Sequence, residues 1–220
     1  KYVLVEQLTN VGCSPCAADN VAFKSSILDV NPNKVRHIAY HVNYPGVDIW
    51  YYEAQDDVNS KKGSFGLPAL PYFATQGNAQ KGAYPGQSLV DQIYNAKSPL
   101  KIVTKKVDNG TSFTVTVTVT SVGAPPTGTS YRLYTALVEK SITKLTPPGT
   151  NGETYFPNVF RKTVTNTSWG AITLPAQGKS LTETYTVTKN SKWNSAAIEM
   201  ISWVQDMNTK EVINVGSTMD

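Results

Sequence analysis

The chain has few of the residues that most often carry catalysis or bind metals. Its 220 residues include 2 cysteines and 2 histidines, which leaves little room for Ser-His-Asp chemistry or for a zinc site that needs four protein ligands. Charged residues make up 16% of the chain and hydrophobic residues 40%, a balance that excludes an intrinsically disordered protein. No apolar run approaches the roughly 18–20 residues of a membrane span. We therefore expect a globular protein whose chemistry centres on its two cysteines.

Signatures of nucleotide and nucleic-acid binding are also missing. The sequence has no Gly-rich loop to cradle phosphates and no nucleophile elbow, so we predict no cofactor. The net charge is +4, but the densest basic group, Lys101, Lys105 and Lys106, has no interleaved aromatic residues. We therefore expect no nucleic-acid partner and interpret the basic residues as a solvated face.

Two domains are the natural expectation for this length. Residues 1–98 alternate strand and helix patterns in the order β-α-β, a connector, then β-β-α, which predicts an α/β domain. The expected strands lie at 2–8, at 34–42 and as a pair within 66–84. The expected helices follow Cys16 and occupy 86–97.

Residues 99–220 change to an alternation of apolar and polar residues with period two. The segment 112–122, SFTVTVTVTSV, shows this pattern most clearly, and similar segments occur at 130–140, 180–189, 196–206 and 210–217. Such strands predict an all-β domain, an antiparallel sandwich of immunoglobulin-like type. The Cys…Trp…Cys hallmark of true immunoglobulin domains is absent, so the strand order stays open. A proline after a helix end in 95–101 marks the boundary.

Cys13 and Cys16 permit three interpretations: metal ligands, a redox pair or a structural staple. A metal site would need His37 and His41 as further ligands, but residues four apart on a strand lie about 13 Å apart. Metal binding is therefore disfavoured.

The redox interpretation requires a strand, then the cysteines, then a helix. The chain has this order, and Pro15 suits the first turn of a helix. The positive field at a helix N-terminus stabilises a thiolate, so Cys13 would be the exposed nucleophile and Cys16 the resolving thiol.

These features resemble the thioredoxin fold. That fold implies an acidic residue on the strand before the cysteines, a position that Glu6 matches seven residues before Cys13. A buried Glu6 would accept the proton of Cys16, whereas a Glu6 at a strand edge would only contact solvent. GLPALPYF (66–73) resembles the thioredoxin Gly-Ile-Pro-Thr segment, which makes Pro68 the expected cis-proline, with Pro71 as the competing candidate and Leu67 beside the substrate.

Five stretches in order resemble the 28-kDa outer-membrane-protein family of Bacteroidetes. They are VLVEQLTNVGCSPC, HIAYHVNYPGVDIWYY, GLPALPYF, NVFRKTV with WG, and WVQDMNTKEVINV. The resemblance implies a thioredoxin-like domain followed by an all-β domain, exported to the periplasm or to the outer membrane and cell surface. Any membrane attachment is expected to run through a lipid anchor outside this chain. The family usually has a histidine near the stretch that begins at Asn158, which this chain lacks.

The segment around His41 offers further candidate site residues. His41 and Asp48 would lie near the cysteines, where His41 could bond a sulfur or a substrate backbone, or would form a purely local polar contact. Trp50, with Tyr51 and Tyr52, would form a peptide-binding rim or would simply pack between segments.

Two functions follow from these observations. The first is an exported thiol–disulfide oxidoreductase-like protein that acts on a protein thiol or disulfide through Cys13 and Cys16, with Glu6 and Pro68 assisting. The second is a non-catalytic binding or adaptor protein in which the cysteine pair is a structural disulfide. The sequence gives no direction of exchange and no oligomeric state, and it leaves open whether the protein is an enzyme.

Overall fold

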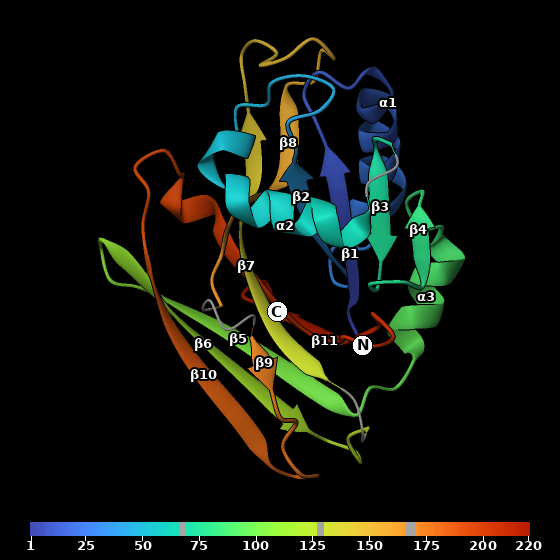
Figure 1. The fold of residues 1–220 in the computed structure, drawn as a ribbon, viewed down its shortest axis with the longest axis vertical. Helices are drawn as coiled ribbons and strands as arrows, with labels where there is room; N and C mark the ends of the chain where they lie inside the picture. Colours follow the sequence, from blue (N-terminus) through green and yellow to red (C-terminus); the bar gives the residue numbers. More distant parts are fainter. Residues whose placement is uncertain (67–68, 127–129, 166–169) are drawn as a thin grey trace.

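A computed structural model describes residues 1–66, 69–126, 130–165 and 170–220. Within these residues the chain forms a nine-stranded sheet and a three-stranded sheet (Figure 1). The larger sheet has the order β12-β11-β7-β8-β2-β1-β3-β4, and β9 pairs with β7. The architecture is thus mixed α/β, with few helices.

The first 98 residues build one end of the larger sheet. The elements are β1 (Val3–Thr9), α1 (Ser14–Phe23), the π-helical turn η1 (Lys24–Leu28), β2 (Val35–His41), the 3-10 turn η2 (Tyr51–Glu53), α2 (Gln55–Phe65), β3 (Tyr72–Thr75), β4 (Gln80–Gly82) and α3 (Gln87–Asn95). Strand β1 pairs in parallel with β2 and antiparallel with β3, and β3 pairs antiparallel with β4. This order and pairing are those of a thioredoxin-like fold.

Helices cover both faces of this part of the sheet, because successive side chains of a strand point to opposite faces. Val3 and Val5 share a core with Phe23 of α1 and with Val90 of α3. Leu4 and Leu8 face the other way, toward Val58 of α2. In Figure 1, α2 crosses in front of β1 and β2. Buried on both faces, β1 has no exposed residue, as expected for a central strand.

The remaining residues are almost entirely β-structure. The elements are β5 (Leu100–Asp108), β6 (Ser112–Ser121), β7 (Tyr131–Thr143), β8 (Tyr155–Thr163), β9 (Ala171–Ile172), β10 (Ser180–Thr188), the 3-10 turn η3 (Ser195–Ala197), β11 (Ile198–Asp206) and β12 (Val212–Ser217). The three-stranded sheet has the order β10-β6-β5. The predicted alternation in β6 is confirmed: Phe113, Val115, Val117 and Val119 are fully buried, and the threonines between them are half-buried.

The apolar face of this three-stranded sheet packs on the larger sheet. The core between them contains Val115 and Val117 of β6, Leu133 of β7 and Met200 and Val204 of β11. Two β-layers therefore face each other, whereas the immunoglobulin-like class expected for 99–220 stays a prediction.

Strands from both sides of residue 98 lie in the larger sheet. Its continuity runs through β8, which bridges in parallel to β2 at Ala39 and Val159 and pairs antiparallel with β7. A second connection joins β2 to the C-terminal segment: the buried guanidinium of Arg36 donates to Ser217 Oγ at 2.8 Å and to Asp220 Oδ1 at 2.6 Å. The division into 1–98 and 99–220 stays a prediction, and the two segments are joined by backbone pairing and by the ion pair of the buried Arg36 guanidinium with Asp220.

Candidate functional site

The two cysteines form a disulfide where β1 runs into α1. The Sγ atoms of Cys13 and Cys16 are 1.97 Å apart. Cys13 is the N-cap of α1, and its sulfur accepts a hydrogen bond from Cys16 N at 3.3 Å. Pro15 lies in the first turn, as predicted. The order of strand, cysteine pair and helix is therefore confirmed, and a backbone N–H group of the first helical turn, that of Cys16, already points at the Cys13 sulfur.

Both cysteines are buried, contrary to the expectation for Cys13. The exposed fraction is 3% for Cys13 and 0% for Cys16. A nucleophile at a helix N-terminus is usually accessible. Loops from two other parts of the chain hold residues 10–13 in place here, which the sequence pattern could not reveal.

One of these loops is the connector between β2 and η2. The Asp48 carboxylate accepts from Val11 N at 3.0 Å and from His41 Nδ1 at 2.8 Å. Asn10 Nδ2 donates to Val42 O at 2.6 Å and to Gly46 O at 2.8 Å. Asp48 therefore connects His41 to the backbone two residues before Cys13.

The Asp48 carboxylate is buried yet favours its charged form. Burial alone would raise its pKa, but the charge of His41 and hydrogen bonds from His41, Val11 N and Trp50 N together lower the pKa below its ordinary value. Several hydrogen-bond donors together therefore stabilise the charged carboxylate of Asp48.

Trp50 does not form an exposed rim. It is 3% exposed, and its ring lies 4.6 Å from those of His41 and Phe156. Tyr51 is also buried, whereas Tyr52 is 57% exposed. Packing between segments, the alternative interpretation, describes Trp50 better than substrate binding does.

Glu6 is fully buried on the face of β1 that α2 covers. Its Oε1 accepts from Tyr40 Oη at 3.0 Å and lies 2.6 Å from Lys61 Nζ. Its Oε2 has no hydrogen-bond partner among the described residues. Burial and the neighbouring Glu6 raise the pKa of Tyr40 well above its ordinary value. The buried position, rather than the solvent-exposed alternative, is therefore the one observed.

The Lys61 ammonium lies among aromatic rings, a feature that sequence reasoning missed. The distances from Nζ to the ring centroids are 5.8 Å for Tyr40, 5.3 Å for Phe65, 5.2 Å for Tyr134 and 5.0 Å for Trp203. Cation–π attraction adds to the ion pair with Glu6. Because Tyr134 and Trp203 come from β7 and β11, this cage ties α2 to the second half of the chain.

His37 lies on the other face of β2 in a neutral environment. Its Nε2 contacts Gln7 Oε1 at 3.0 Å, and its Nδ1 contacts Asn158 Nδ2 at 3.4 Å. Burial, together with the charge of His41, lowers the pKa of His37 to about 3. Among the described residues no group of three or more His, Cys, Asp or Glu side chains could hold a metal ion.

The proline segment before β3 is described in part. Leu67 and Pro68, the predicted substrate contact and cis-proline, lie outside the described residues. The Leu70–Pro71 peptide is cis and directly precedes β3, so the competing candidate has this conformation. A second cis peptide joins Tyr44 and Pro45.

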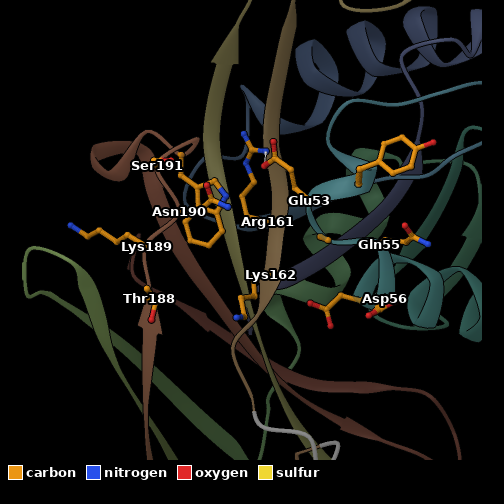
Figure 2. Close-up of a pocket in the computed structure, with 13 residues that line it drawn as sticks. Glu53, Gln55, Asp56, Arg161, Lys162, Thr188, Lys189, Asn190 and Ser191 are labelled. Atoms are coloured by element: carbon orange, nitrogen blue, oxygen red, sulfur yellow. Dashed lines mark hydrogen bonds and ion pairs between the residues drawn. The ribbon is translucent and has the colours of Figure 1, made fainter.

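A separate groove of about 850 Å³ lies between the start of α2, β8 and the segment after β10. In Figure 2 the residues Glu53, Gln55 and Asp56 form one wall and the 188–191 segment the opposite wall, with Arg161 between them. The buried indole Nε1 of Trp193, which also lines the groove, has no hydrogen-bond partner among the described residues. Of the residues expected to form a peptide-binding rim, Tyr52 lines this polar groove, and Trp50 and Tyr51 do not.

The buried guanidinium of Arg161 closes the floor of the groove with two ion pairs. Its Nη1 donates to Glu53 Oε2 at 2.9 Å, and its Nη2 donates to Glu139 Oε2 at 2.8 Å. The guanidinium is committed to these two carboxylates, which lie on η2 and β7.

No family model and no curated protein matches this sequence. Among solved structures the chain is similar to HBP35 of Porphyromonas gingivalis, with a TM-score of 0.79 and 16% identity over 99% of this chain and 74% of that chain. A domain of the outer membrane lipoprotein Omp28 from the same organism matches with a TM-score of 0.38 and 21% identity over 56% of this chain and 88% of that chain. The first likeness establishes a shared fold.

Among the described residues, no helix combines the length and the apolar character that a membrane span requires.

Proposed function

We propose that this protein is a thiol–disulfide oxidoreductase-like protein that exchanges disulfides with protein partners. One observation carries the proposal: the Cys13–Cys16 disulfide begins α1 of a thioredoxin-like fold, with Cys16 N donating to Cys13 Sγ. The same N–H group would stabilise a Cys13 thiolate once the bond is reduced.

In the proposed reaction, the Cys13–Cys16 disulfide oxidises a partner that carries two thiols. A partner thiolate attacks Cys13 Sγ, the Cys13–Cys16 bond breaks, and a mixed disulfide forms while the Cys16 sulfur leaves as a thiolate and takes up a proton. A second partner thiolate then attacks the mixed disulfide, which releases an oxidised partner and the reduced cysteine pair. The reverse sequence oxidises the protein and reduces the partner.

Glu6 is the proposed proton acceptor for Cys16 in the reverse direction. The Oε2 of this buried carboxylate supports that assignment, since none of the described residues makes a hydrogen bond to it. Lys61, at 2.6 Å from Oε1, offsets the carboxylate charge. Pro68 keeps its proposed role beside the disulfide with Leu67, and the cis Pro71 is the alternative for that role.

We assign the chain to the 28-kDa outer-membrane-protein family as part of the same proposal. The order of its sequence motifs supports this assignment, as well as export to the periplasm or outer membrane and an immunoglobulin-like second domain. The expected partner is a protein that carries a thiol or a disulfide.

Mixed-disulfide trapping tests the proposed function. Cys16→Ser should accumulate a covalent complex with a reducible protein disulfide such as that of insulin, because Cys13 can attack but nothing resolves the product. Cys13→Ser should give no such complex while the fold is retained. If neither variant nor the wild-type chain exchanges with any protein disulfide, the oxidoreductase proposal fails.

The second candidate is a non-catalytic binding protein with a structural disulfide. The burial of both sulfurs favours it, and the polar groove of Figure 2 offers such a protein a place to hold a ligand. A disulfide that resists every thiol would decide for this alternative.

A further inference from the structure

A loop from the second half of the chain lies against the cysteine motif. The loop, residues 144–154, joins β7 to β8, and we name it the strap. Asn151 N donates to Val11 O at 3.0 Å, while Asn151 Nδ2 lies within reach of Asn10 O at 3.3 Å and of Cys13 O at 3.4 Å. Figure 1 shows the strap in gold at the end of the molecule where β1 turns into α1.

The approach is close enough to exclude a side chain. A Cβ atom built on Gly149 would lie 2.3 Å from Val11 O and 2.5 Å from Val11 Cγ2. Only glycine allows the strap to lie this near to the motif backbone. On the other side, Thr150 Oγ1 lies 3.6 Å from the Cβ position of Gly12.

The strap is also tied to the helix that carries Cys16. Glu153 Oε1 accepts from Asn20 Nδ2 of α1 at 2.7 Å, and Glu153 Oε2 accepts from Asn151 Nδ2 at 2.5 Å. Glu153 N in turn donates to Asn151 Oδ1 at 3.0 Å. Asn151 thus links the carbonyl of Cys13 to a carboxylate that α1 holds.

These contacts accompany the unusual burial of Cys13, which is 3% exposed although it is a helix N-cap. The connector on the opposite side, through Asp48, belongs to the same half of the chain as the cysteines. The strap is the contribution of the second half to the redox site.

We propose that Asn151 is a positioning residue that holds the strap over the disulfide, and that the strap makes Cys13 selective by size. Small thiols reach Cys13 past the strap, whereas a folded protein reaches it only when the strap is released. This inference rests on the proposed function, because the molecules that the strap would admit or exclude are the thiol partners of the exchange reaction. Its test measures alkylation of Cys13 and therefore does not require catalytic turnover.

The deciding test compares a small and a large alkylating reagent on the folded protein after reduction with a phosphine. The reagents are iodoacetamide and a polyethylene-glycol maleimide, and mass spectrometry follows modification of Cys13. Asn151→Ala should raise the rate with the large reagent about tenfold and change the rate with iodoacetamide by less than about threefold, because a hydrogen bond that held the strap is lost. Asn109→Ala, in the exposed turn between β5 and β6, is the matched control and should change neither rate.

An unchanged ratio of the two rates in Asn151→Ala overturns the proposal, as does an equal rise in both. Asn151→Ser also keeps the backbone hydrogen bond to Val11 O but removes the amide that reaches Asn10 O and Cys13 O, so it carries the same expectation if Asn151→Ala does not fold. A rise in the ratio of the large-reagent rate to the iodoacetamide rate, without any exchange with protein disulfides, would reject the proposed function but support the size selectivity of the strap.

Discussion

Lys61 is the residue on which the buried charge of Glu6 depends. Its ammonium is the cation paired with Glu6 Oε1. Removing one partner of a buried ion pair usually lowers the free energy of unfolding by about 3–5 kcal/mol. We expect a loss of about this size for Lys61→Met, measured by urea denaturation.

Lys62→Met is the control for this change, since no ion pair of Lys62 is present among the described contacts, and it should alter the free energy by less than about 0.5 kcal/mol. The double variant Glu6→Gln with Lys61→Met should recover part of the loss. A Lys61→Met protein as stable as the wild type would contradict the account of the cage.

His37 makes stability depend on pH. Its pKa is about 3 in the folded protein and 6.5 ordinarily, so below 6.5 the unfolded chain binds a proton that the folded chain refuses. The free energy of unfolding therefore falls as pH falls, by about 1.4 kcal/mol per pH unit between these two values.

For His37 this amounts to a loss of about 2.5 kcal/mol between pH 7 and pH 4.5. His37→Gln removes the titrating group, so its stability should vary less over this range. Chemical denaturation at both pH values measures the difference, and parallel losses in the two proteins would rule out His37 as the cause.

The strap is an element whose geometry leaves little freedom. Gly149→Ala places a methyl group against Val11 O and should lower the free energy of unfolding by about 1–3 kcal/mol through overpacking. Gly46→Ala, where an added Cβ meets nothing within 4 Å, should change it by less than about 0.5 kcal/mol. Thermal unfolding compares the two variants, and equal midpoints would contradict the close contact between Gly149 and Val11.

Elements with strong patterns could be predicted from the sequence. The apolar run of β1, the alternation of β6 and the amphipathic helix α3 all lie within a residue or two of their expected bounds. Helix α2 was not expected, because QDDVNSKKGSF contains two large apolar residues, Val58 and Phe65, which are too few to form a helical pattern. Acidic residues in its first turn and Gly66 at its end favour this helix locally, and the Lys61 cage holds it in place.

The candidate site was predictable only where it is local in sequence. The cysteine pair and the helix start follow from a contiguous stretch, whereas the sequence left open whether Glu6 is buried or lies at a strand edge. Asn151 and Glu153 lie more than 130 residues away from Cys13 and Asn20, and nothing in a Pro- and Gly-rich loop indicates which surface it will cover. The strand β8 was missed for a related reason: Pro157 and the lack of alternation hide it.

At the scale of the whole molecule, Arg161 joins the two halves through Glu53 and Glu139. Arg161→Met leaves the buried Glu139 and the partly buried Glu53 without this cation, and we expect the free energy of unfolding to fall by about 3–5 kcal/mol. Lys162→Met, its exposed neighbour in the sequence, should change it by less than about 0.5 kcal/mol. A single cooperative transition with an unchanged midpoint in Arg161→Met would contradict this role.

The whole molecule therefore combines a cysteine pair in a thioredoxin-like fold with a second half that contacts residues 1–98 at several places. The Lys61 cage, the Arg161–Glu53 ion pair and the strap each bring residues of 99–220 to within hydrogen-bond or ring-contact distance of 1–98. In this account the second half does more than fold beside the first: it positions the cysteine motif.

The reduction potential of the Cys13–Cys16 pair tests the central claim most directly. Equilibration of the full chain with dithiothreitol buffers, read out by mass spectrometry after thiol trapping, gives this value. We predict a potential in the range of exchange catalysts, about −270 to −120 mV. A potential below about −300 mV, with no exchange with protein disulfides, would identify a structural disulfide and contradict the account.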